Sequence, residues 1–188
     1  MSISKYSIIA LLLSFSCSIT QAATETLNLS ATIEAPTCDL NVVGGSNGIV
    51  DLGEVEITDF EKKNILTQQG KAFVLQLTNC KGAGWGNLKP TLKINGDQED
   101  VTGNGIFRTA SQSSSKNIGI LLKYGASDYS QANELTNVPF YWEIGKYSDK
   151  VPNTQSYSFW LGLSRVGDYS QTRAGTVSAN INFSFEWH

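Results

Sequence analysis

The chain has 188 residues, with 14 lysines and arginines against 17 aspartates and glutamates, a formal net charge of −3. Binding to nucleic acid needs a surplus of basic residues on one face, and the scattered basic residues here argue against that class of protein. The only histidine is the terminal His188, so the sequence also lacks the clustered ligands of a zinc site.

Residues 1–22 have the pattern of a secretory signal peptide. Lys5 supplies a positive charge, Ile8 to Phe15 form an apolar run, and small residues precede the expected cleavage site. We expect export and a mature chain near residues 23–188, about 166 residues that suit one domain. Cys17 is disfavoured as a lipid-attachment site because the residues before it lack the expected leucine.

Two cysteines remain after the leader, Cys38 and Cys80, which lie 42 positions apart. In an exported protein two cysteines are expected to form one disulfide. Closing a loop of this length stabilises the fold by about 4 kcal/mol in the chain-entropy model.

Short apolar alternations separated by turn residues recur along the mature chain and predict an all-β protein. The first strand alternates at Leu27, Leu29, Ala31 and Ile33, and Pro36 ends it. Residues 40–42 continue as far as a glycine pair, and residues 49–57 are a further strand candidate. Residues 59–71 are expected to form a loop or one short helical turn.

The middle of the chain repeats this pattern. Residues 73–77 alternate and lead into Asn79-Cys80, and residues 92–94 lead to Asn95-Gly96, which is a turn signal. Residues 97–116 are polar and predict a long surface loop, which Ile106 and Phe107 interrupt.

The later strands are predicted at residues 118–124, which are apolar on both faces, at 140–142 and at 157–163. With a turn at 167–173 before the last strand, the chain has seven or eight strands at the spacing of a β-sandwich. From Gly175 to His188 apolar and polar residues then alternate without a break, which predicts a long, central strand with one buried face. The edge of such a strand must be paired internally or by another chain.

No catalytic motif or cofactor motif is present, and we expect neither an enzyme nor a cofactor. His188 as a general base would stand at a chain end, and Asp97, Glu99 and Asp100 lie in a polar loop, whereas a catalytic acid needs burial to raise its pKa. The tryptophans Trp85, Trp142 and Trp160 are candidates for stacking on a sugar ring, although packing in the sandwich is the more ordinary role.

The leader, the placement of Cys38 and Cys80 after alternating strands, and the terminal alternation together resemble a fimbrial subunit of the chaperone-usher class, the type 1-like pilins. That family carries a glycine fourteenth from the end and an aromatic residue next to last, where this chain has Gly175 and Trp187. The resemblance implies an incomplete immunoglobulin-like β-sandwich lacking its final strand, completed by a donor strand from another protein.

The resemblance further implies a structural, minor subunit of a surface fimbria. Its partners would be a periplasmic chaperone, an outer-membrane usher and neighbouring subunits, and it would be exported through the periplasm to the cell surface. The groove that accepts the donor would be lined by residues of the last two strands: Tyr157, Phe159, Leu161, Leu163, Gly175, Val177, Ile181, Phe183, Phe185 and Trp187. These residues would also be ordinary core, and Gly175 would either open a pocket or form a tight turn.

Two expectations concern the ends of the mature chain. The terminal carboxylate of His188 would anchor the chaperone. Leu27, Leu29, Ala31 and Ile33 would either be the segment donated to the next subunit or the first strand of the domain itself, which would suit a minor or terminating subunit. The alternative function is a single-domain adhesin that binds a host glycan.

Overall fold

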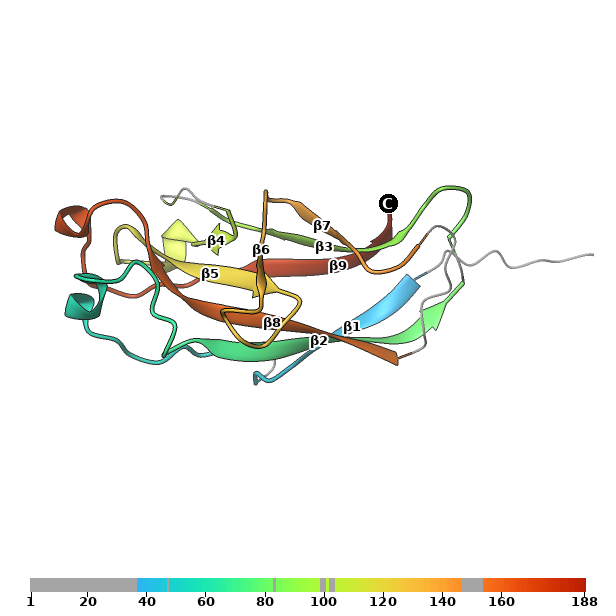
Figure 1. Cartoon of the computed structure of the whole chain (residues 1–188), viewed down its shortest axis with the longest axis horizontal. Helices are drawn as coiled ribbons and strands as arrows, with labels where there is room; N and C mark the ends of the chain where they lie inside the picture. The colour runs from blue at the N-terminus through green and yellow to red at the C-terminus, as the bar shows by residue number, and fades with distance from the viewer. Residues whose placement is uncertain (1–36, 47, 83, 99–100, 102–103, 147–153) are drawn as a thin grey trace, which may run out of the picture. The chain divides into compact units, whose positions relative to one another are not determined.

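The computed structural model describes residues 37–46, 48–82, 84–98, 101, 104–146 and 154–188, and it confirms the all-β prediction (Figure 1). The described strands form two antiparallel sheets. No helix in these ranges is long and apolar enough to cross a membrane. The leader and the segment that contains Leu27, Leu29, Ala31 and Ile33 lie outside the described residues.

The larger sheet carries most of the strands. Its order is β1-β2-β8-β5-β4, and β6 also pairs with β5. The bounds are β1 (Thr37–Val43), β2 (Lys71–Lys81), β4 (Ile106–Phe107), β5 (Ile118–Tyr124), β6 (Asn133–Glu134) and β8 (Thr154–Arg165).

The smaller sheet has the order β7-β3-β9, so the last strand lies at its edge. Its strands are β3 (Pro90–Gly96), β7 (Phe140–Glu143) and β9 (Ile181–Trp187), and the short 3-10 helices are η1 (Ile57–Phe60), η2 (Ala110–Gln112) and η3 (Tyr169–Gln171). Asn95 and Gly96, predicted to turn, instead continue β3 and pair with Asn182 and Ile181 of β9.

The two sheets pack face to face through aromatic rings. Phe73 of β2 stacks on Phe159 of β8 with ring centroids 5.0 Å apart, and Phe183 of β9 packs edge-on against both rings at 5.8 and 5.3 Å. The alternation predicted for these strands therefore places one face of each in the core between the sheets, as a sandwich requires, and β8 is buried on its other face as well from Trp160 onward.

Strand β5 is buried on both sides, as its apolar composition predicts. Leu122 points into the main core, while Leu121 on the opposite face packs with Trp160 and Ala132. Ala132 belongs to the segment between β5 and β7, so this connection covers the outer face of the sheet.

The predicted disulfide is confirmed. Cys38 of β1 is bonded to Cys80 near the end of β2, and the two strands pair with each other. The bond therefore ties the first described strand to its neighbour at one end of the larger sheet.

Two predictions about local structure were wrong. Residues 49–57 form no strand: residues 50–56 have no regular structure, and η1 follows. Residues 97–116 are not simply a surface loop, because they contain β4 and η2 and bury Phe107, Arg108 and Thr109. Arg108 lies inside because its guanidinium donates to the Ser113 and Ser115 carbonyl oxygens, at 3.3 and 2.6 Å.

The prediction of one long, central strand at the end of the chain was also wrong. Only β9 belongs to a sheet, and it is an edge strand. In residues 174–180 apolar and polar residues still alternate, but these residues are not part of the sheet. Their backbone is hydrogen-bonded to the loop 109–115 and not to a neighbouring strand.

Candidate functional site

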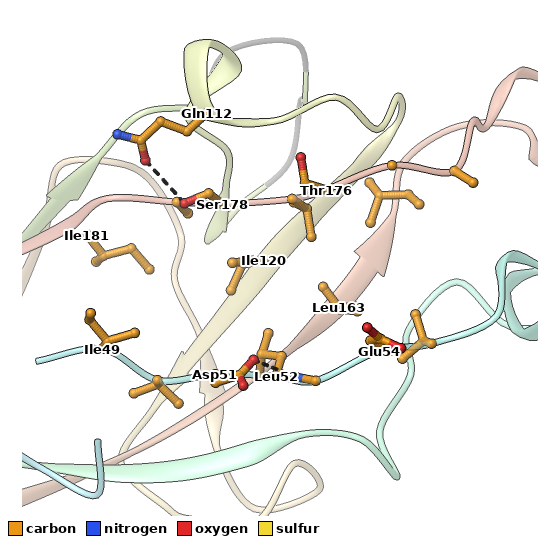
Figure 2. A pocket seen from close by; sticks show the side chains of 18 of the residues that line it. Ile49, Asp51, Leu52, Glu54, Gln112, Ile120, Leu163, Thr176, Ser178 and Ile181 are labelled. Atoms are coloured by element: carbon orange, nitrogen blue, oxygen red, sulfur yellow. Dashed lines mark hydrogen bonds between the residues drawn. The ribbon is translucent and has the colours of Figure 1, made fainter. Parts of the chain in front are cut away.

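A groove of about 1500 Å³ runs between two segments that are far apart in the sequence (Figure 2). One wall is the segment 48–60, and the other is the segment 174–182, which leads into β9. Ile118 and Ile120 of β5 and Leu163 of β8 line the groove between these walls. We call this cavity the terminal groove.

Three alternate residues of the 174–182 wall, Thr176, Ser178 and Asn180, are bonded to the loop 109–115. The backbone N–H groups of Thr109 and Ser114 donate to the carbonyl oxygens of Ser178 and Thr176, at 2.8 and 3.0 Å. In return, the hydroxyl oxygens of Ser114, Ser113 and Thr109 accept from the N–H groups of Thr176, Ser178 and Asn180, at 2.9, 2.9 and 3.1 Å. One edge of this wall is thereby paired.

The other edge of the same wall is open. Neither Val177 nor Ala179 forms a backbone hydrogen bond to any described residue. The same one-sided pairing of the backbone continues in β9. His188 exchanges two backbone hydrogen bonds with Lys89, so in the antiparallel register the backbone N–H and C=O groups of the even-numbered residues point toward β3. The N–H and C=O groups of odd-numbered residues, such as Ile181, therefore point away from the sheet.

The facing wall also leaves its backbone unpaired. From Val50 to Val55, the one hydrogen bond to a backbone donor among the described residues is local, from the Gly53 N–H to the Asp51 carboxylate at 2.9 Å. A slot with free donors and acceptors on both sides and an apolar floor matches the requirements of one added β-strand.

Most of the apolar side chains along the terminal groove are only half-buried. Phe60, Ile118 and Leu163 are buried, but eight other apolar residues that line the groove keep part of their surface exposed. These are Val50, Leu52, Val55, Ile57, Ile120, Val177, Ala179 and Ile181. The incomplete burial marks apolar surface that a further strand would cover.

The structure places the predicted groove residues in two groups. Leu163, Gly175, Val177 and Ile181 line the terminal groove. Tyr157, Phe159, Leu161, Phe183, Phe185 and Trp187 do not line it; they belong to or pack against the main core.

The sequence did not identify the 48–60 wall or the β5 residues Ile118 and Ile120 as groove-lining. Residues 49–57 are predicted only as a further strand, and the spacing of their apolar residues shifts between Leu52 and Val55. An alternation reports a buried face and says nothing about whether the edges are paired.

The end of the chain is held against the smaller sheet. The His188 imidazole stacks on the Tyr141 ring with centroids 4.3 Å apart, and its Nδ1 lies 3.9 Å from the Glu186 carboxylate. Trp187 packs against the β2–β3 connection, where a Cβ atom on Gly84 would lie 2.3 Å from its ring. Both residues are thus positioned at the end of β9.

The tryptophans and acidic residues considered for sugar binding or catalysis lie in different environments. Trp142 packs against Tyr124 and Trp160 is buried, whereas Trp85 is 87% exposed in the β2–β3 connection. Asp97 accepts a hydrogen bond from the Thr109 hydroxyl at 3.1 Å, and the neighbouring acidic residues Glu99 and Asp100 lie outside the described residues. No cluster of metal-ligating side chains occurs in the described ranges.

Comparisons with known proteins identify the family and the fold. The family model described as Fimbrial protein matches residues 15–187. No curated protein matches the chain.

Among solved structures, the chain is similar to the P pilus rod subunit PapA, with a TM-score of 0.51 and 14% identity over 81% of this chain and 100% of that one. It is also similar to the CupB6 tip adhesin from Pseudomonas aeruginosa, with a TM-score of 0.52 and 18% identity over 80% of this chain but only 38% of the adhesin. The P pilus adaptor subunit PapF matches with a TM-score of 0.49 and 16% identity over 84% of this chain and 100% of that one.

The likenesses to PapA and to the CupB6 adhesin establish the fold as an immunoglobulin-like sandwich that lacks its last strand, as predicted. Because the family model covers nearly the whole sequence, the chain belongs to the fimbrial protein family.

Proposed function

We propose that this protein is a structural, non-enzymatic, minor subunit of a surface fimbria and that it is assembled by donor-strand complementation. The observation that carries the proposal is the terminal groove, where backbone groups without a partner among the described residues flank half-buried apolar side chains on both walls. A donor strand would satisfy both kinds of surface at once.

The groove would be filled twice during assembly. After export and removal of residues 1–22, a periplasmic chaperone would insert a strand and bind the terminal carboxylate of His188. At the outer-membrane usher, the segment of a neighbouring subunit would replace that strand. Leu163, Gly175, Val177 and Ile181 would contact the donor in both complexes. The minor position is supported by the few residues between the predicted cleavage site and Leu27.

The energetics favour dependence on a donor. Four donor side chains buried in the groove would contribute about 6 to 12 kcal/mol before the cost of ordering the donor. Because single domains are stable by only about 5 to 15 kcal/mol, the chain without a donor would be marginal.

A refolding experiment tests the proposal. The chain from Ala23 onward is refolded from denaturant with and without a peptide that alternates leucine and threonine over about 13 residues, the approximate length of the segment 175–187. We expect the peptide to shift the unfolding midpoint, followed by tryptophan fluorescence, to higher denaturant.

Two matched variants locate the effect. Val177→Asp places a charge in the groove and should abolish the shift, while Val43→Asp changes a valine that is 50% exposed outside the groove and should preserve it. Identical unfolding midpoints with and without peptide in the unaltered chain would contradict the proposal.

A further inference from the structure

The charged side chains that line the terminal groove are all carboxylates. They are Asp51, Glu54, Glu56 and Asp59, and no lysine, arginine or histidine lines the groove with them. All four are exposed, and within the described part of the chain none of them forms an ion pair.

This negative charge lies on one side of the groove. The 174–182 wall contributes only neutral polar groups, and the hydroxyls of Thr176 and Ser178 already bond to Ser114 and Gln112.

The nearest basic residues along the chain lie beyond the groove. Lys62 and Lys63 line a separate cavity of about 280 Å³ next to Asp59. The guanidinium of Arg173, which precedes the second wall, donates to the carbonyl oxygens of Ser170 and Thr172. The carboxylates of the 48–60 wall are therefore not neutralised inside the groove.

A strand inserted here would turn alternate side chains toward the apolar floor and the rest toward solvent. The solvent-facing side chains would lie beside the 48–60 wall. Opposite charges on neighbouring strands attract and like charges repel, so this wall favours a donor with basic outward-facing residues.

The corresponding segment of this same chain has the wrong charge. The segment 23–35 carries Glu25 and Glu34 and no basic residue. A second copy that donated this segment would bring negative charge to a negative wall.

We propose that the terminal groove receives its donor from a different polypeptide, one whose strand alternates apolar inward-facing residues with lysine or arginine facing outward. The inference rests on the proposed function and names the partner's chemistry. It assigns Asp51, Glu54 and Glu56 to partner selection, since they lie along the slot and make no ion pair with the described residues.

Three peptides that share one apolar face test this proposal. All three are based on the segment 23–35 and keep its apolar residues Leu27, Leu29, Ala31 and Ile33. One is unchanged, one carries Asn28→Lys, Ser30→Lys and Thr32→Lys, and one carries glutamate at the same three positions. Association with the refolding chain is followed by stopped-flow tryptophan fluorescence.

At low salt we expect the lysine peptide to associate at least about tenfold faster than the glutamate peptide, with the unchanged peptide closer to the latter. The difference should shrink as added salt shortens the Debye length to about 3 Å at 1 M.

Two double variants with the same change in net charge locate the effect. Glu54→Gln with Glu56→Gln removes charge from the wall, and the Glu56 side chain caps no helix. Glu61→Gln with Asp168→Asn removes charge from exposed positions outside the groove. The first pair should reduce the preference for lysine severalfold, and the second should leave it unchanged.

The outcomes separate this inference from the proposed function. Equal rates for the lysine and glutamate peptides, a faster glutamate peptide, or an equal loss of preference in both double variants would overturn the charge selection while leaving strand insertion intact. If none of the three peptides and not even the leucine–threonine peptide bound, the proposed function itself would fall.

Discussion

Gly175 packs directly against the backbone of Ser115: a Cβ atom on Gly175 would lie 2.6 Å from the Ser115 amide nitrogen. The φ angle of Gly175 is +155°, which other residues rarely adopt. The sequence left a pocket or a tight turn as the reasons for a glycine here. The structure supplies a third reason, the close approach of the groove wall to the loop 109–115.

Gly175→Ala is therefore expected to push the wall away from the loop and to lower the free energy of unfolding of the peptide-bound protein by about 1–3 kcal/mol. Gly48→Ala is the control, because Gly48 has a φ of +77° but no atom near its Cβ position. Denaturant unfolding of both variants measures the difference. An equal loss in the two variants would show that backbone strain, and not the contact with Ser115, requires the glycine.

The disulfide between Cys38 and Cys80 closes a loop across β1 and β2. Replacing both cysteines by serine should lower the free energy of unfolding by about 4 kcal/mol, because the unfolded chain regains the entropy that the loop of 42 residues removes. Chemical reduction of the unaltered protein should reproduce this loss in denaturant unfolding. A loss below about 1 kcal/mol would mean that the bond contributes little to the fold.

Tyr157 is buried in the core, and its hydroxyl has no hydrogen-bond partner among the described residues. Burial disfavours the phenolate and raises the pKa of Tyr157 from 10.0 to about 12. The folded-state value is thus above the unfolded one. The corresponding stability is fully present below pH 10 and is lost as the pH rises through about 12.

Two measurements follow from this burial. An ultraviolet titration should show one tyrosine ionising near pH 12, and Tyr157→Phe should remove that step. The same substitution should leave stability at pH 7 unchanged or raise it by up to about 1 kcal/mol, because it removes an unsatisfied polar group. A clear loss of stability at pH 7 would reveal a hydrogen bond to the hydroxyl.

Much of the fold could be predicted because the alternation of apolar and polar side chains along a strand indicates which face of the strand is buried. Phe73, Leu75 and Leu77 face the core as their spacing requires, and the two-sided apolar character of β5 matches its burial on both faces. The cysteine pairing followed from the expected export and from there being two cysteines after the leader.

The groove could be predicted only in part. Alternation identified Val177 and Ile181 as facing inward, but it could not show that they lie beside an open slot. It also could not show that Phe183 and Phe185 pack in the core away from that slot. The wall at 50–56 looks like any half-buried strand in the sequence, since its lack of a partner is a property of its neighbours.

The sequence alone determined which faces are apolar, which cysteines pair, and that the chain ends in an alternating segment. The tertiary structure decided that β9 is an edge strand and that the loop 109–115 pairs one side of the segment before it. It also decided that the wall opposite is acidic and that its residues 50–55 have no backbone-to-backbone hydrogen bond to the described part of the chain. The physical reason is that side-chain burial is encoded at each residue, whereas the backbone partners of a strand come from distant parts of the chain.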